Sequence, residues 1–315
     1  MEYNKMICDL AVGDQIEGYY VLKTAQGRTT ASGKPFLAAV FQDCSGTIEA
    51  KVWDYSGPIS AANEGNAVKV RGSVSEFRGA LQMTVDRIRL AEEGDQMDLS
   101  CLVPTAPIDA GEVYRDVERI VDSIQDGDYR ALCRRMLQRY GEALRTIPAA
   151  KSVHHSFRGG LLMHTYTMLR AADSLSQLYE DIVDRSLLLA GTLLHDFAKA
   201  EEFCFSSLGL VTEYSVKGQL LGHLVMGAQR VAEAAAELGT PEEKSVLLQH
   251  MLLSHHGQPE FGAAVVPACA ESELLSLIDT MDSRMEIYRE ALAEVPAGEF
   301  SKRIFALDKR LYRHS

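Results

Sequence analysis

The spacing of apolar residues changes once along this chain, and that change constrains the fold more than any other feature. Up to about residue 95, apolar and polar residues alternate, as in TIEAKVWD at residues 47–54, which is typical of a half-buried strand. Glycine-containing turn signals interrupt the alternation at residues 32–33, 44–46 and 78–79. About five strands in roughly 85 residues predict a small closed barrel, for which the OB-fold is the candidate.

From about residue 109 onward, apolar residues recur every three or four positions, which predicts α-helices. The stretch between the two patterns carries acidic residues and two prolines and shows no clear period, as a linker does. We therefore expect a multidomain α and β protein: a five-stranded OB-fold β-barrel over residues 1–95, a linker over 96–108 and an all-α domain over 109–315. The basic, amphipathic tail at 296–315 is expected to add a packing helix with one solvated face.

Composition bears on compartment and partners. The six cysteines are scattered singly and none forms a CxxC pair, which predicts a reducing cytoplasm. No stretch of about 18 uncharged apolar residues occurs and the N-terminus lacks a secretory apolar run, so we expect no membrane association. The net charge of −12 argues against a protein coated in basic surface. Residues 20–90 nevertheless carry nine Lys/Arg against six Asp/Glu, so a local nucleic-acid surface remains compatible with the charge.

Eight of the nine histidines lie between His154 and His256, and several fall within or at the end of apolar helical segments. A single histidine at a helix edge is usually structural, whereas a buried aspartate beside an imidazole is costly unless the pair binds a cation. Five apolar helices that each deliver a His or an Asp therefore favour one shared metal site. The residues concerned are His164, His195 with Asp196, His223, His255 with His256, and Asp279 or Asp282.

The donor types indicate which chemistry such a site would support. Imidazole and carboxylate ligands without thiolate suit Mn, Fe, Co, Ni or Zn. Asp196 directly follows His195, and its two oxygens allow it to bridge two ions. Two ions about 3.5–4 Å apart can hold both the attacking and the leaving oxygen of a phosphoryl transfer. The pattern therefore indicates phosphoryl chemistry on a helical domain.

These histidines and aspartates, in this order on successive helices, resemble the HD-domain superfamily of metal-dependent phosphohydrolases, and Lys199 completes an HDxxK string. The flanking strings HHSFRGGLLMHT, LLLAGTLLHDFAKAEEF, KGQLLGHLVMG and LLSHHGQPEFG, with LIDTMD, resemble the YhaM family of 3′→5′ exoribonucleases. That family pairs an N-terminal OB-fold with a C-terminal HD domain, the order expected here. The resemblance implies an enzyme that hydrolyses single-stranded RNA, with single-stranded DNA as an alternative, and releases nucleoside 5′-monophosphates.

The resemblance also implies a role for each residue of the site. Two divalent ions are implied, Mn²⁺ in the first place, with Co²⁺, Mg²⁺, Fe²⁺ and Zn²⁺ as alternatives. Lys199 and Arg158 would contact the substrate phosphate. Asp282 stays open as an alternative to Asp279, and His256 as a phosphate contact instead of a ligand. One ion would be held by His164, His195, Asp196 and Asp279, and the other by Asp196, His223, His255 and His256.

Three further histidines are expected to lie off the metals: His154 and His155 in a loop beside the site, and His250 in the core or next to the ligands. On the barrel, single-strand binding calls for basic residues along the backbone of the strand and aromatic rings under its bases. Phe41 and Trp53 are expected in the barrel core. The candidates for the binding face are Phe36, Phe77, Lys34, Lys51, Arg71 and Arg78.

Other functions remain open from the sequence. The same site would serve an HD-domain nucleotide phosphohydrolase, which would not need the barrel. A single-strand DNA-binding accessory protein with an inactive HD domain would need the barrel alone, and a di-iron oxygenase would use the same ligand types. The barrel could also mediate self-association, so a homo-oligomer is a further alternative. The metal and the RNA or DNA preference are not fixed by the sequence.

Overall fold

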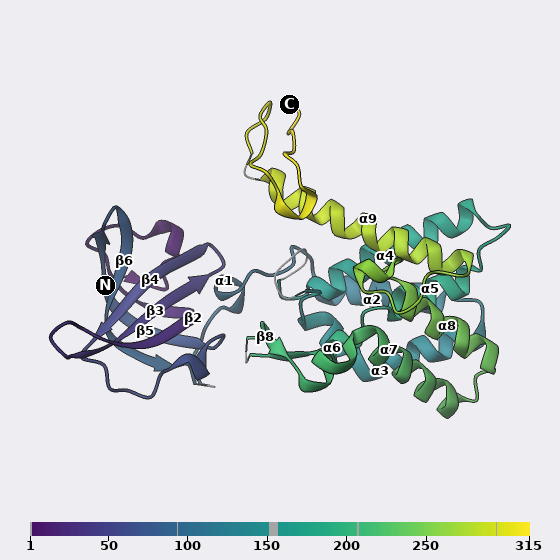
Figure 1. The fold of residues 1–315 in the computed structure, drawn as a ribbon, viewed down its shortest axis with the longest axis horizontal. Helices are drawn as coiled ribbons and strands as arrows, with labels where there is room; N and C mark the ends of the chain where they lie inside the picture. Colours follow the sequence, from purple (N-terminus) through teal and green to yellow (C-terminus); the bar gives the residue numbers. More distant parts are fainter. Residues whose placement is uncertain (1, 93, 151–156, 207, 294) are drawn as a thin grey trace. The chain divides into compact units, whose positions relative to one another are not determined.

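The computed structural model describes residues 2–92, 94–150, 157–206, 208–293 and 295–315. The chain divides into two compact units, Met1–Thr105 with Cys204–Glu213, and Ala106–Phe203 with Tyr214–Ser315. The first unit carries the strands and the second the long helices, which confirms the expected fold class (Figure 1). Among the residues described, no helix combines the length and apolar character that a membrane span requires.

Five strands close into a barrel in the first unit. The sheet order is β1-β2-β3-β4-β6-β5, and β2 also pairs with β5, which completes the closure. In β4 the burial alternates along the strand as the TIEAKVWD pattern predicts, because successive side chains point to opposite faces. The strands are β1 (Glu2–Tyr3), β2 (Gln15–Thr29), β3 (Pro35–Asp43), β4 (Gly46–Trp53), β5 (Ala67–Phe77) and β6 (Ala80–Leu90).

Three short elements accompany the barrel. The helix α1 (Leu99–Leu102) lies within the stretch expected as a linker, and Leu102 with Val103 packs against Tyr19 and Val21. Strands β7 (Phe203–Phe205) and β8 (Val211–Tyr214) form a separate two-stranded sheet. Residues 204–213 of this hairpin are grouped with the barrel, although the chain enters and leaves it from the helical unit.

Eight α-helices, α2 to α9, are described in the second unit, and α6 is the shortest of them. Four of the longer ones begin at a residue whose side chain accepts hydrogen bonds from the first turn: Asp109, Asp126, Asp184 and Ser215. The most buried helix is α5, whose side chains from Ser186 to Leu194 are all buried, and it packs against α3, α4, α8 and α9. The helices before it are α2 (Ala110–Asp122), α3 (Gly127–Thr146) and α4 (Gly160–Leu178). From α5 on they are α5 (Arg185–Leu194), α6 (Lys199–Glu202), α7 (Val216–Leu238), α8 (Glu242–Ser254) and α9 (Ala270–Ala293).

The C-terminal tail is not the packing helix that its composition predicts. Isolated antiparallel bridges join Phe300 to Tyr312 and Ile304 to Lys309, so the chain folds back on itself as a hairpin. Pro296 lacks a backbone N–H, and Gly298 has a φ of 83°, both of which oppose a helix at this point. The expectation was wrong because an amphipathic pattern does not distinguish a short helix from a hairpin whose ends are fixed by such residues.

One close approach in the barrel depends on a glycine. The pairing of β5 with β6 shifts register between Arg71 and Gly72. A Cβ added at Gly72 would lie 2.2 Å from the carbonyl oxygen of Thr84 and 3.0 Å from the Cα of Val85, both of which are backbone atoms. A side chain there could be admitted only if the two strands moved apart.

We therefore expect Gly72→Ala to lower the free energy of unfolding of the barrel by about 2–3 kcal/mol, because the backbone must shift to remove the overlap. Urea unfolding followed by the fluorescence of Trp53 reports on the barrel, since Trp53 is the only tryptophan and lies in β4. Gly27→Ala in β2 is the matched control, because an added Cβ meets no atom within 4 Å there. Equal unfolding midpoints for the two variants would contradict the steric argument.

Candidate functional site

Helix ends bring the expected metal ligands together in the second unit. His164 lies in the first half of α4 and Asp279 in α9, while His195 and Asp196 directly follow α5. His255 directly follows α8. His223 follows a break in α7 at Gly222, whose φ of 70° and ψ of 163° are not helical. Ending or interrupting a helix at these points turns the side chains inward rather than along the helix surface.

The carboxylate of Asp196 lies between two groups of imidazoles. Its Oδ2 is 3.3 Å from Nε2 of His195 and 3.8 Å from Nε2 of His164. Its Oδ1 is 3.4 Å from Nε2 of His223 and 3.8 Å from Nε2 of His255. The two oxygens of one side chain therefore face different sets of donors, as a bridging ligand requires.

The remaining expected ligands complete these two groups. Asp279 Oδ1 lies 3.3 Å from Nε2 of His164, on the side that faces the other donors. The donor atoms of His223, His255 and His256 all lie within 4.8 Å of one another, and so do those of His164, His195 and Asp196. The structure thus brings together the seven residues expected to bind metal. The first and last of them, His164 and Asp279, are 115 positions apart in the sequence.

Four of the imidazoles are oriented by a contact to Nδ1, the ring nitrogen that faces away from the centre of the site. His195 and His255 each lie 2.8 Å from a backbone oxygen, of Thr192 and Leu252 respectively. A carbonyl oxygen can only accept, so Nδ1 of both rings donates, and in the neutral ring Nε2 then carries a lone pair directed at the centre.

The other two imidazoles are held by carboxylates. Nδ1 of His164 lies 2.7 Å from Asp282 Oδ2, and Nδ1 of His223 lies 3.1 Å from Glu202 Oε1. Asp282 therefore contacts the outer nitrogen of His164, whereas Asp279 lies on the inner one, and this favours Asp279 over Asp282 as the ligand. Carboxylates of this kind fix ring orientation at metal sites.

Glu202 has a second contact, which the sequence did not reveal. Its Oε1 also accepts from the backbone N–H of His223, 3.0 Å away, where α7 resumes after Gly222. The same carboxylate thus caps the restarted helix and orients the ring. No spacing signal could have identified Glu202, because the contact depends on the path of the chain through α6, β7 and β8.

The buried donor atoms fit a bound cation. Among the residues described, Asp196 Oδ1, His223 Nε2, His255 Nε2 and His256 Nδ1 are buried without a hydrogen-bond partner. Leaving such atoms unpaired costs about 1–3 kcal/mol each. Lone pairs of imidazole that face a carboxylate oxygen repel it unless a positive charge lies between them. A divalent ion with nitrogen and oxygen ligands would satisfy all of these atoms at once.

Electrostatics keep His255 neutral and Asp196 charged, the forms that bind a cation, but favour the protonated form of His164. Burial lowers the pKa of His255 well below its usual value, and neighbouring His195 and His256 lower it further, so this ring stays neutral. Burial raises the pKa of Asp196, but Lys199 and His195 outweigh it and hold that pKa well below the usual range. Burial opposes the charged form of His164 as well, yet its hydrogen bonds to Asp279 and Asp282 raise its pKa to about 9 in the metal-free chain.

Lys199 and Arg158, the expected phosphate contacts, are placed differently. The Nζ of Lys199 donates to Asp196 Oδ2 at 2.7 Å, and its side chain is 16% exposed. Arg158 precedes α4 and accepts a hydrogen bond from Ala106 through its backbone oxygen. Its side chain has no hydrogen bond or ion pair with any site residue that the structure describes.

Of the three histidines expected to lie off the metals, one contacts a loop and two lie outside the described residues. His250 accepts through Nε2 from the backbone N–H of Ala268 at 3.0 Å, so it steadies the loop after α8 instead of joining the ligands. His154 and His155 lie outside the described residues.

A second candidate site lies on the outer face of the barrel. Lys51 Nζ is 5.4 Å from the centre of the Trp53 ring and 4.9 Å from that of Phe77. The rings of Phe36 and Trp53 are 5.0 Å apart, and the guanidinium of Arg78 is 5.3 Å from the Phe77 ring. We call these five residues the aromatic platform. Phe77 is 50% exposed and Trp53 is 47% exposed.

Not every residue expected on this face belongs to the aromatic platform. Phe41 is fully buried, as expected, but the expectation that Trp53 fills the core is wrong, because it points outward at the end of β4. Lys34 pairs with Asp54, at 3.6 Å. Arg71 lies six residues before Phe77 on the same strand, or about 20 Å away along β5, and is opposite Arg87.

Comparisons with known proteins match most of the barrel but only part of the helical unit. A family model described as "OB-fold nucleic acid binding domain" matches residues 21–91. A model described as "Putative helicase" matches residues 113–184, which end before His195 and include His164 as the one expected ligand. The first match agrees with the observed barrel, and residues 21–91 are thus similar to nucleic-acid-binding OB-folds.

Similar solved structures include single OB-fold domains and a tRNA synthetase. The second OB-fold domain of replication protein A from Methanococcus maripaludis is 16% identical over 31% of this chain and 100% of that chain, with a TM-score of 0.23. An OB domain from Thermoplasma acidophilum is 13% identical over 31% of this chain and 92% of that one, with a TM-score of 0.25. Aspartyl tRNA synthetase from Entamoeba histolytica is 13% identical over 57% of this chain and 37% of that one, with a TM-score of 0.23.

A carboxylate that orients a ligand and a carboxylate expected to be a ligand itself predict different effects on metal affinity. We expect Asp282→Asn to weaken Mn²⁺ binding about 10–100-fold, because it loosens the ring without removing a ligand. Asp196→Ala should abolish binding, since both groups of donors lose their shared oxygen atoms. Titration calorimetry measures both effects. Asp181→Asn, an exposed position after α4, is the matched control. Wild-type affinity in Asp282→Asn would contradict the assigned role.

Proposed function

We propose that this chain is a metal-dependent phosphodiesterase of the HD-domain class that shortens single-stranded RNA from its 3′ end. The observation that carries the proposal is the Asp196 carboxylate, whose two oxygens face separate groups of inward-turned imidazoles. The resemblance of the flanking strings to the YhaM family suggests the direction and the product, a nucleoside 5′-monophosphate. The OB-fold of residues 21–91 supports nucleic acid as the substrate.

The helical unit would hold two divalent ions, with Mn²⁺ as the first choice. Bound there, such ions supply Lewis acidity that activates water and stabilises charge on the phosphoryl oxygens. The chain's own residues prepare the site for them. Thr192, Leu252, Asp282 and Glu202 fix the rings of the four inward-facing histidines, so no reorganisation of these ligands is needed when a substrate binds.

Lys199 would act mainly through Asp196. Its ammonium group holds Asp196 Oδ2 and balances part of the negative charge that the buried carboxylates bring to the site. Its partial exposure also allows it to add positive charge near a bound phosphate. This role differs from a free phosphate-binding lysine, because the hydrogen bond to Asp196 is already made.

The aromatic platform would hold the single strand. Stacking between a base and an aromatic ring tolerates any base, since every base has a π face, and nearby cations pair with the phosphates. Two half-exposed rings with Lys51 between them provide both kinds of contact. A nucleotide phosphohydrolase would have no use for this surface, and an accessory binding protein would have no use for the assembled ligands.

The class, direction and site can be tested together. RNA and DNA oligomers labelled at the 5′ or the 3′ end are incubated with Mn²⁺ and wild-type protein. We expect a ladder of 5′-labelled products that shortens from the 3′ end, and a loss of about a thousandfold or more in Asp196→Asn, because the shared ligand is weakened. Asp181→Asn should keep full activity. Internal cleavage products, or activity that survives in Asp196→Asn, would reject the proposal.

The aromatic platform generates a separate prediction. Trp53→Ala and Phe77→Ala should each weaken binding of a single-stranded oligonucleotide about tenfold, since each removes one stacking surface. Fluorescence anisotropy in EDTA measures affinity while hydrolysis is blocked. Tyr179→Ala, which removes an aromatic ring that is 43% exposed on the helical unit, is the control. Unchanged affinity in both platform variants would place the binding surface elsewhere.

A further inference from the structure

The C-terminal segment is a folded element that has no role in the proposed activity. We call residues 298–313 the C-terminal hairpin. Its two arms are joined by hydrogen bonds from Ser301 to the Leu311 oxygen and from Ile304 to the Lys309 oxygen, each 2.8 Å long. Leu311 is buried, and Arg313 donates to the backbone oxygens of Leu292 and Val295. The hairpin is therefore fastened to the end of α9, beyond which it is seen in Figure 1.

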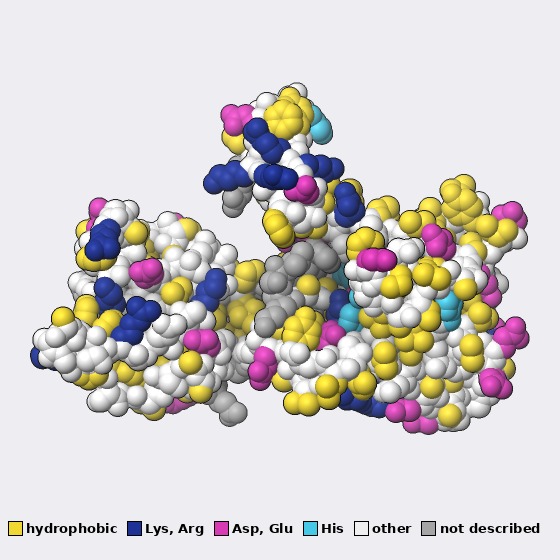
Figure 2. Space-filling model, viewed as in Figure 1, with side chains coloured by type: hydrophobic (Ala, Val, Ile, Leu, Met, Phe, Trp, Pro, Cys, Tyr) yellow, Lys and Arg dark blue, Asp and Glu magenta, His cyan; other side chains and the backbone are white. Residues whose placement is uncertain are grey.

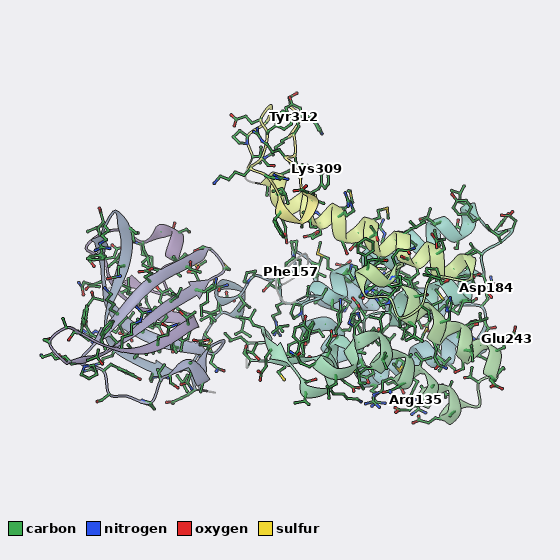
Figure 3. The ribbon with its side chains drawn as sticks, viewed as in Figure 1. Arg135, Phe157, Asp184, Glu243, Lys309 and Tyr312 are labelled. Atoms are coloured by element: carbon green, nitrogen blue, oxygen red, sulfur yellow. The ribbon has the colours of Figure 1, made fainter. Side chains whose placement is uncertain are left out.

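The C-terminal hairpin has the opposite charge to the chain as a whole. It carries five Lys/Arg and two acidic residues, whereas the complete chain has a net charge of −12. Figure 2 shows dark blue side chains gathered on this segment, and Figure 3 labels Lys309 and Tyr312 on it. A basic element attracts anionic partners, which the acidic remainder of the protein repels.

The cations of the C-terminal hairpin fall into two kinds. Arg310 and Arg313 donate to backbone oxygens and Arg303 pairs with Asp308, so these three hold the hairpin together. Lys302 and Lys309 are exposed, and neither has an ion pair within the part of the chain that the structure describes. Lys309 Nζ lies 5.2 Å from the centre of the Tyr288 ring, so its one recorded partner is an aromatic face and not a carboxylate. Both lysines can therefore contact an anionic ligand without breaking an ion pair.

The exposed apolar surface of the C-terminal hairpin consists of aromatic rings. Phe305, at the turn, is 99% exposed, and Phe300 and Tyr312 are 56% and 50% exposed. The rings of Phe300 and Tyr312 lie 5.1 Å apart. Exposed rings of this size are unfavourable in water and commonly mark a binding surface. The buried aliphatic residue, Leu311, is on the inner side.

We propose that the C-terminal hairpin is a second contact for single-stranded nucleic acid, in which Phe305 stacks on a base while Lys302 and Lys309 contact the adjoining phosphates. Exposed cations beside exposed aromatic rings are what single strands require. A protein partner fits less well, because the cores of protein interfaces are depleted in lysine and need a contiguous apolar area. The inference adds a binding site to the proposed function and depends on that function only for the choice of ligand.

The test measures binding to a fluorescent 15-nucleotide RNA in EDTA, so that no hydrolysis is needed. We expect Phe305→Ala to weaken binding about tenfold and Phe305→Trp to stay close to wild type, while Phe305→Leu resembles the alanine variant because only a ring can stack. Lys302→Ala with Lys309→Ala should reduce the slope of log affinity against log salt by about 0.7 for each lysine. Tyr179→Ala and Lys217→Ala are matched exposed controls.

Two outcomes would overturn the inference. One is wild-type affinity and an unchanged salt slope in the Phe305 and lysine variants. The other is a change in molar mass, measured by light scattering, in Phe305→Ala with unchanged RNA affinity, because that would assign the C-terminal hairpin to self-association. Failure of the proposed activity would instead appear as absence of hydrolysis by wild-type protein with Mn²⁺, and it would leave these binding measurements unaffected.

Discussion

The helical unit is organised around one buried carboxylate shared between two sets of imidazoles. A charged Asp196 in an apolar interior would be strongly unfavourable by itself, and Lys199 with the surrounding histidines offsets that cost. The rest of the arrangement follows from this constraint. Helices α5 and α8 end at the ligands, α7 breaks before His223, and α9 supplies carboxylates to both nitrogens of His164.

The order of the barrel and the helical unit along the chain was predictable, because each sequence pattern is local. The alternation in β4 and the three- and four-residue spacing of the helices depend only on which face of an element is buried. The clustering of the candidate ligands was predictable for a similar reason, since histidines on apolar helices are conspicuous. Trp53 was misassigned because its apolar ring suggested the core, although alternation puts it on the same face of β4 as Thr47, Glu49 and Lys51.

Residues that orient other residues were the hardest to anticipate. Glu202 and Asp282 lie 21 and 118 positions from the histidines they hold, and neither stands out in sequence from a surface acid. The hairpin at the C-terminus was missed because its fold depends on Gly298 and on side chains that donate to backbone oxygens, such as Arg313. Contacts of this kind are created by tertiary structure and leave no periodic trace in the sequence.

Glu202 lies where the chain passes from the helical unit into the hairpin of β7 and β8. This residue ends α6, and β7 begins at the next position, so the hairpin grouped with the barrel is covalently attached one residue beyond it. Ser215, on the return side, donates through its backbone N–H to the Glu202 oxygen. Because the side chain of Glu202 also holds the ring of His223, a displacement of the backbone at residue 202 would turn that imidazole relative to Asp196.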